Sequence, residues 1–147
     1  MAERLLDVNV PMYAAGKEHP YKVPCAWVMT EIAEGRIEAA IDVEIIQELL
    51  YRYGAIKQWR LGVTMAENLL DIVTQIYPIE PADVRLTIKL FERYTPKGIT
   101  ARDAVHVAVM QNNGLTEIIS TDAHFDLIKG IQRLDPQMLF GHQEKRD

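Results

Sequence analysis

The stretch ITARDAVHVAVMQNNGLTEIISTD, residues 99–122, decides the fold. Thr100 is a good N-cap, and the helix that follows it to Asn113 is apolar on nearly every side, which indicates a central, buried helix. Asn113-Gly114 ends this helix, and Glu117 to Thr121 then form a predicted buried strand. Because only a short loop joins the two, the helix must run antiparallel to the strand and begin at the strand's carboxyl end.

Strands and helices alternate along the rest of the chain. Further strands are predicted at Leu5–Val10, at Arg36–Ile41, around Tyr77–Ile79 and, as a fifth edge strand, at Ile131–Leu134. Helices are predicted at 24–33, 42–53, 56–76 and 80–94, with a short helix or turn from Asp122 and a charged, frayed tail from His142. The alternation predicts an α/β fold, a three-layer α/β/α sandwich whose central, mainly parallel sheet has about four to five strands.

Length and composition are those of one soluble domain, residues 1–147, with its core at about 4–136 and its tail at 142–147. The content of 48% hydrophobic and 25% charged residues argues against a disordered chain. Cys25 is the only cysteine, which excludes an intrachain disulfide and a cysteine-held metal centre. We find no apolar run of the roughly 18 residues that a membrane helix needs, and we expect a cytoplasmic protein.

Four acidic residues are predicted to meet at one edge of the sheet. Asp7 lies toward the end of the first strand, and Glu48 lies about one and a half turns into the helix that follows the second. Asp103 is in the first turn of the buried helix, and Asp122 directly follows the strand after it. Ligand sites of such sheets lie at the carboxyl ends of the strands. The topology therefore gathers these carboxylates in one cleft.

A cluster of four carboxylates predicts a metal ion. The charges repel one another and raise each other's pKa unless a cation neutralises them. Ligation by oxygen alone suits Mg²⁺ or Mn²⁺, and a carboxylate-held Mg²⁺ keeps several waters, one of which it can acidify into a nucleophile. Hydrolysis of a phosphodiester is the natural use of such a site. The net charge of −5 argues only against a broad basic surface, not against one groove for a nucleic acid.

Each acid except Asp7 also has a purely structural explanation. Glu48 can form an exposed ion pair with Arg52 one turn later, and Asp103 stands three residues after Thr100, the spacing of a capping box. Asp122 can be an N-cap or turn residue. Asp7 is harder to explain, because a carboxylate in an apolar strand without a partner costs several kcal/mol.

Other polar side chains near the predicted cleft have less certain roles. His106 can be a metal ligand or a base, but a hydrogen-bonded core histidine is the favoured interpretation, and His124 is expected to be exposed without a role. Arg102 adjoins Asp103 and can touch a substrate phosphate. Four more cations can extend a basic rim: Arg52, Lys57, Arg60 and Lys97. The apolar face with Trp59, Val63 and Leu70 is expected to be core, and to bind protein wherever it is exposed.

Four segments carry a resemblance to a known family: LLDVNVPMYA (5–14), DVEIIQELLYRY (42–53), ITARDAVHVAVM (99–110) and IISTDAHFD (118–126). Together they resemble the PIN domain family, and in particular the VapC-type toxin ribonucleases of VapBC toxin–antitoxin pairs. The resemblance covers about Leu5 to Pro136.

The resemblance implies an endoribonuclease that depends on Mg²⁺ or Mn²⁺ and leaves 3′-hydroxyl and 5′-phosphate ends. It implies that Asp7, Glu48, Asp103 and Asp122 form the metal site. Asn9, Ser120 and Asp126 match polar positions that support the site in the family. A homodimer and an antitoxin partner are further expectations.

Other functions remain open alternatives. The chain can be a catalytically silent PIN-fold module that binds RNA or protein, or an RNA-processing nuclease outside a toxin–antitoxin pair. A phosphatase is less attractive, because Asp7-Val8-Asn9 lacks the second aspartate of an Asp-x-Asp nucleophile pair. The sequence contains neither the G-x-G-x-x-G pattern nor the P-loop pattern of nucleotide-binding proteins.

Overall fold

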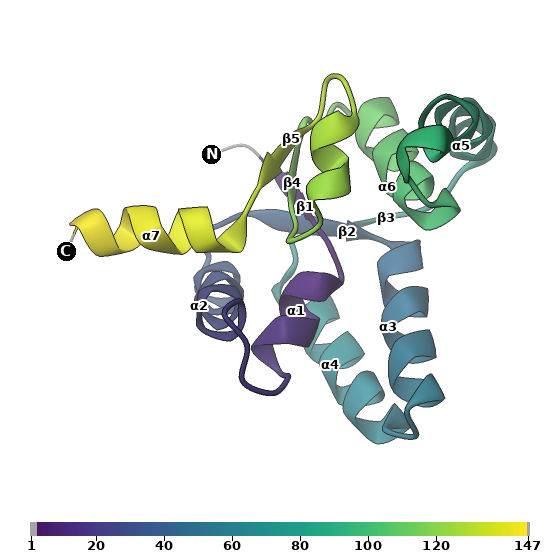
Figure 1. Cartoon of the computed structure of the whole chain (residues 1–147). Coiled ribbons are helices and arrows are strands. Elements are labelled where there is room, and N and C mark those ends of the chain that lie inside the picture. Colours follow the sequence, from purple (N-terminus) through teal and green to yellow (C-terminus); the bar gives the residue numbers. More distant parts are fainter. Residues whose placement is uncertain (1–2, 147) are drawn as a thin grey trace.

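A central sheet of five parallel strands organises the molecule (Figure 1). The structure, a computed structural model, describes residues 3–146, with side chains through residue 143. The strands are β1 (Arg4–Leu6), β2 (Ala39–Asp42), β3 (Gln75–Tyr77), β4 (Glu117–Ile119) and β5 (Gln132–Leu134). They lie in the order β3-β2-β1-β4-β5, and every neighbouring pair is parallel. The predicted α/β fold with a parallel sheet is confirmed.

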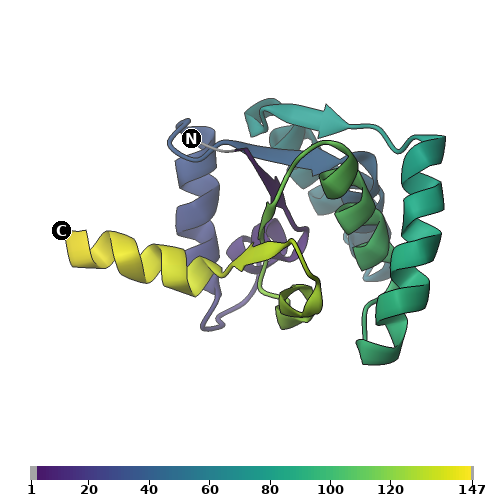
Figure 2. The same ribbon diagram turned by 90° about the horizontal axis from the view of Figure 1, so that it is seen from above.

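Helices cover both faces of this sheet. They are α1 (Asn9–Ala14), α2 (Lys22–Ala33), α3 (Val43–Ala55), α4 (Trp59–Ile72), α5 (Pro81–Tyr94), α6 (Ala101–Asn112) and α7 (Pro136–Arg146), with 3-10 turns η1 (Thr95–Lys97) and η2 (Ala123–Leu127). Helices α5 and α6 lie on one face and α1 to α4 on the other (Figures 1 and 2). None of the helices within residues 3–146 is long and apolar enough to cross a membrane.

The alternation of side chains along each strand separates two hydrophobic cores. Leu5 and Ile118 pack into one core, with the buried residues of α6. Leu6 and Ile119 pack into the other, with α2 and α3. Successive residues of a strand point to opposite faces of the sheet, so two adjacent apolar residues of one strand contribute to different cores. β1 is the central strand of the sheet, and all four residues of its neighbour β2 are buried.

The first strand is shorter than the predicted Leu5–Val10. It ends at Leu6, and α1 begins at Asn9. Asp7 and Asn9 are poor strand residues, and Pro11 lies in the first turn of α1, where a helix does not need its missing N–H. The prediction failed because Val8 and Val10 have the apolar character of strand residues, whereas they pack into the core from the turn and from α1.

The predicted helix 56–76 was too long at both ends. Helix α3 continues to Ala55, Lys57 adopts a left-handed backbone with φ 59°, and α4 begins only at Trp59. Helix α4 ends at Ile72, where β-branched residues favour an extended chain, and β3 therefore begins at Gln75, before the predicted start. The second strand is likewise displaced, to Ala39–Asp42.

The C-terminal segment also differs from its prediction. Residues Pro136–Arg146 form helix α7 instead of a tail that frays from His142. Asp135 precedes this helix, and its Oδ1 accepts a hydrogen bond from the Gln137 N–H at 2.8 Å. That bond caps the helix start. The last predicted tail residue, Asp147, lies outside the described residues.

Candidate functional site

A pocket of about 160 Å³ lies at the carboxyl edge of the sheet. It is lined by Asp7, Val8, Asn9, Glu48, Arg52, Thr100, Arg102, Asp103 and Asp122. All four predicted acids are among these residues. They arrive from the end of β1, from α3, from the first turn of α6 and from the end of β4. The topological argument for their convergence is therefore confirmed, while their roles remain a prediction.

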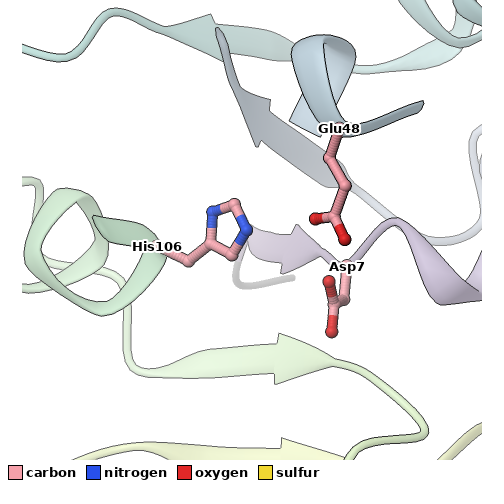
Figure 3. A group of neighbouring side chains, drawn as sticks. All are labelled: Asp7, Glu48 and His106. Carbon is pink, nitrogen blue, oxygen red and sulfur yellow. The ribbon is translucent and has the colours of Figure 1, made fainter. Parts of the chain in front are cut away.

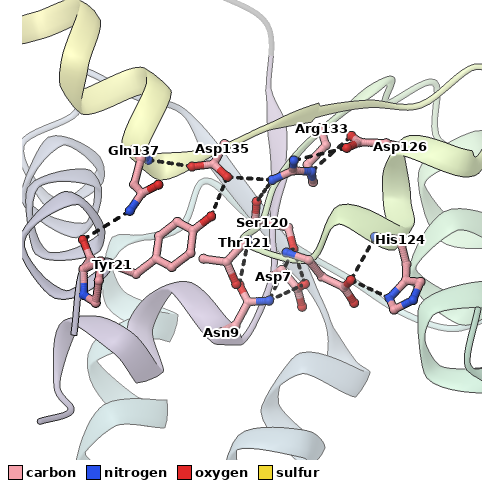
Figure 4. A network of polar contacts seen from close by, with 12 residues as sticks. Asp7, Asn9, Tyr21, Ser120, Thr121, His124, Asp126, Arg133, Asp135 and Gln137 are labelled. Atoms are coloured by element: carbon pink, nitrogen blue, oxygen red, sulfur yellow. Dashed lines mark hydrogen bonds and ion pairs between the residues drawn. The ribbon is translucent and has the colours of Figure 1, made fainter.

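Asp7 is buried, with 5% of its surface exposed, the same fraction as Glu48. Its Oδ1 accepts a hydrogen bond from the Val8 N–H at 2.8 Å. Its Oδ2 accepts hydrogen bonds from Ser120 Oγ at 2.6 Å and from Asn9 Nδ2 at 3.1 Å (Figure 4). Burial nevertheless raises the pKa of Asp7, because these bonds only partly compensate for lost hydration. A cation at the pocket would stabilise the charged form.

Asn9 and Ser120 join the ends of β1 and β4. Ser120 Oγ accepts a hydrogen bond from the Asp122 N–H at 3.0 Å, in addition to its bond with Asp7. Asn9 Oδ1 accepts from the Thr121 N–H at 3.3 Å. The two side chains thus hold Asp7 and the backbone before Asp122 in one network. The supporting role in the site that the resemblance implies for them stays a prediction.

Glu48 carries the ion pair that its structural explanation required. Arg52 Nε donates to Glu48 Oε2 at 3.2 Å, and Arg102 Nη1 lies 3.2 Å from the same oxygen. Arg102 also donates to Glu44 at 3.2 Å. The structural explanation assumed an exposed Glu48, but only 7% of its side chain is accessible. Two guanidinium groups therefore lie beside a buried carboxylate at the pocket.

Asp103 and Asp122 also have the structural roles that the sequence suggested. The Asp103 N–H donates to Thr100 Oγ1 at 3.1 Å, and Asp103 Oδ2 accepts from the Thr100 N–H at 3.2 Å, which completes a capping box. Asp122 Oδ1 accepts from the His124 N–H at 2.9 Å and lies 2.8 Å from His124 Nδ1. His124 is exposed as predicted, but its contact with Asp122 was not foreseen.

Asp126 lies apart from the pocket lining. It is exposed on η2, and both of its carboxylate oxygens accept hydrogen bonds from Arg133 at 3.1 Å. Arg133 in turn donates to the backbone oxygen of Ser120 at 3.1 Å. The connection between Asp126 and the pocket is therefore indirect and runs through one arginine (Figure 4).

His106 also lies at this site, and its contact with Asp42 is what the sequence did not reveal. It is 1% exposed, and its Nδ1 lies 2.7 Å from Asp42 Oδ2, so it is the predicted hydrogen-bonded core histidine. Burial opposes its charged form, but the charges of Asp42, Asp7 and Glu48 outweigh burial and raise its pKa to about 9. The ring therefore belongs to the acidic site as well as to the core.

The donor atoms fit a divalent metal ion. Asp7, Glu48 and His106 each offer one ligand atom, and these atoms lie within 4.8 Å of one another (Figure 3). Carboxylate oxygens suit Mg²⁺ and Mn²⁺, and Asp103 and Asp122 bring two more to the same pocket. A larger pocket of about 560 Å³ shares Asn9, Arg52 and Asp122 with the acidic one.

Comparisons with known proteins show the family of the chain. The model of the PIN domain family matches residues 4–131. Ribonuclease VapC13 of Mycobacterium tuberculosis is 35% identical over 130 residues, which are 88% of this chain and 98% of that protein. Ribonuclease VapC7 of the same organism is 30% identical over 133 residues, 90% of each chain.

Solved structures share the fold at lower identity. VapBC2 from Rickettsia felis, bound to a fragment of promoter DNA, matches with a TM-score of 0.71 and 17% identity over 91% of this chain and 98% of that one. VapC20 of M. tuberculosis, described as a toxin that cleaves the sarcin–ricin loop, matches with a TM-score of 0.72 and 12% identity over 86% of this chain and 94% of that one. On the sequence matches, the chain belongs to the PIN domain family, with VapC ribonucleases among its relatives.

Proposed function

We propose that this protein is an endoribonuclease that requires Mg²⁺ or Mn²⁺ and serves as the toxin of a type II toxin–antitoxin pair. The observation that carries the proposal is the convergence of Asp7, Glu48, Asp103 and Asp122 on one pocket. Curated relatives of similar length that are named VapC ribonucleases support the substrate class. The cytoplasm, where RNA is available, is the compartment that we propose for it.

The carboxylates of the pocket would hold the metal. A bound divalent ion lowers the pKa of a water and stabilises charge on a phosphoryl oxygen. The chain holds its own groups in place for this chemistry, because hydrogen bonds from Ser120, Asn9 and the Val8 N–H orient the Asp7 carboxylate. Hydrolysis in this arrangement would leave 3′-hydroxyl and 5′-phosphate ends.

Two arginines are suited to position the RNA. Arg52 and Arg102 line the pocket, and each contacts Glu48 through one guanidinium nitrogen. Arg102 Nε also donates to Glu44, so Arg102 Nη2 and the two Nη atoms of Arg52 are the nitrogens proposed to donate to phosphate oxygens, for which the planar guanidinium is well shaped. The neighbouring larger pocket, which also includes Arg52, would receive nucleotides next to the scissile bond.

The proposal includes protein partners, an antitoxin and a second copy of the chain. Solved neighbours described as VapBC complexes support an antitoxin. Exposed apolar side chains on α3 and α4 support protein contacts, since large exposed apolar patches are uncommon on isolated soluble domains.

The direct test is cleavage of an end-labelled single-stranded RNA by the purified protein. We expect cutting with Mg²⁺ or Mn²⁺, none with EDTA, and loss of at least about 100-fold in rate for Asp7→Asn. Asp71→Asn, an exposed aspartate on α4, is the matched control and should cut like the wild type. Cleavage that survives EDTA, or an Asp7→Asn variant as active as the control, would contradict the proposal. RNA binding without cleavage would instead favour a silent binding module.

A further inference from the structure

One ring nitrogen of His106 makes a contact outside the acidic pocket. Asp42 ends β2 and caps α3, because its Oδ1 accepts a hydrogen bond from the Ile45 N–H at 3.1 Å. Its other oxygen lies 2.7 Å from His106 Nδ1. Asp42 is completely buried, so the carboxylate cannot turn away to water. The ring is therefore held in one orientation, with Nδ1 engaged.

The other ring nitrogen has no partner. Among the described side chains, His106 Nε2 is the one buried nitrogen or oxygen without a hydrogen bond. Figure 3 shows this nitrogen on the side of the ring that faces Asp7 and Glu48. A buried polar atom left unsatisfied is costly, and such atoms usually mark a water, ion or functional contact. A water or an ion between the ring and the two carboxylates would give Nε2 its missing partner.

A divalent metal ion fits that place. The ligand atoms of Asp7, Glu48 and His106 lie within 4.8 Å of one another. Bonds of about 2.1 Å to one ion separate its ligands by roughly 3–4 Å, so small side-chain movements suffice. Metal-binding histidines commonly donate their second ring N–H to a carboxylate, as His106 can do to Asp42.

We infer that His106 Nε2 is a nitrogen ligand of the metal site and that Asp42 positions it. The inference rests on the proposed metal-dependent function and adds a ligand of a different type to the four acids. An imidazole ligand favours Mn²⁺ over Mg²⁺, because Mg²⁺ prefers oxygen. The protein therefore selects Mn²⁺ more strongly than a site of carboxylates alone.

Pulsed electron paramagnetic resonance of Mn²⁺ bound to the full chain tests this bond. We expect modulation from a directly bound imidazole nitrogen, which changes when the protein is labelled with ¹⁵N-histidine. The signal should vanish in His106→Gln and persist in His124→Gln, which removes the histidine that contacts Asp122. If His106→Gln fails to fold, the ¹⁵N label still shows whether a histidine nitrogen binds Mn²⁺, and His124→Gln shows whether that nitrogen belongs to His124.

Metal affinity gives a second readout. We expect the Mn²⁺ dissociation constant of His106→Gln to rise about 10- to 100-fold, and that of Mg²⁺ to rise much less. Mn²⁺ bound without a nitrogen signal, but lost in Asp7→Asn, would overturn the histidine ligand and leave the proposed function intact. No Mn²⁺ binding by the wild type would overturn both. A nitrogen signal that survives in His106→Gln would also refute the inference.

Discussion

Asp7 illustrates how single residues at the pocket serve both folding and chemistry. A buried carboxylate is costly, and three hydrogen-bond donors hold it at the end of β1. Its pKa is nevertheless raised by burial. The remaining electrostatic cost is what a bound cation would relieve. The same side chain thus lowers the stability of the protein without a cation and lies at the centre of the proposed site.

Ser120 should matter through Asp7. Ser120→Ala removes the donor to Asp7 Oδ2 and the acceptor for the Asp122 N–H. We expect Mn²⁺ affinity or cleavage to fall about 10- to 100-fold, the range for partners that orient metal ligands. Calorimetric titration with Mn²⁺ and RNA cleavage measure the two effects. Thr64→Ala, on the exposed surface of α4, is the control. Unchanged values in Ser120→Ala would show that Asp7 does not need this support.

Cys25 should be chemically silent in the folded protein. It lies on the buried face of α2, and burial raises the pKa of its thiol to about 12. The thiolate is the reactive form, so it is essentially absent at pH 8 in the folded state. The unfolded chain ionises near its ordinary pKa, so this thiol makes folding less favourable as pH rises above that value. Labelling with Ellman's reagent should be slow without denaturant and fast in urea, and fast native labelling would contradict this burial.

At the scale of elements, α6 links folding to the site. Thr100 and Asp103 form the capping box that starts the helix, and the same turn places Asp103 at the pocket. The sequence predicted this helix and its start correctly, because capping residues and apolar periodicity agree there. It did not reveal that His106, one turn later, faces both Asp42 and the acids, since that contact joins residues 64 positions apart.

Asp135 joins β5 to α7 and gives a pH-dependent test. Burial alone would raise its pKa, but hydrogen bonds from Tyr21 and Arg133 outweigh burial and lower the pKa below 3.8 (Figure 4). The stability that the carboxylate contributes is present above its ordinary pKa and is lost as pH falls through the lower folded-state value.

We therefore expect Asp135→Asn to lower the free energy of unfolding by about 1 kcal/mol at pH 7. The expected loss is this small because Asp135 is partly exposed and water screens its charge. The difference from the wild type should shrink below pH 3.8. Urea unfolding at neutral and acidic pH measures both values, with Asp71→Asn as the control. A difference that stays the same at both pH values would show that the charge of Asp135 does not stabilise the fold.

At the scale of the whole molecule, the order of the strands explains why distant acids meet. The chain adds β2 and β3 on one side of β1, and β4 and β5 on the other. Asp7 therefore lies beside the strand that ends before Asp122, although 115 positions of sequence separate the two acids. Alternation of strands and helices was enough to predict a parallel sheet with the four acids at one edge, but it gave no order of the strands. The sequence could not give the lengths of the strands, because strands of three or four residues leave too short a pattern.

The tip of the α3–α4 hairpin, away from the sheet in Figure 1, should bind protein. The face with Trp59, Val63 and Leu70 was expected to be core, yet Trp59 is 57% exposed and its neighbours Tyr51 and Ile56 are exposed too. We expect the purified protein to be a dimer that becomes monomeric in Trp59→Gln/Val63→Gln, because the interface loses apolar area. Light scattering after size exclusion gives the mass. A double variant that is still a dimer would place the dimer contact elsewhere. A wild type with the mass of a monomer would exclude the dimer.

The most direct measurement of the central claim is anomalous diffraction from crystals soaked in Mn²⁺. If the four acids form one metal site, an anomalous peak will lie in the pocket lined by Asp7, Glu48, Asp103 and Asp122, within bonding distance of at least two of them. The peak should be absent from crystals of Asp7→Asn. A pocket without anomalous density at saturating Mn²⁺, or a peak that Asp7→Asn leaves unchanged, would contradict the account.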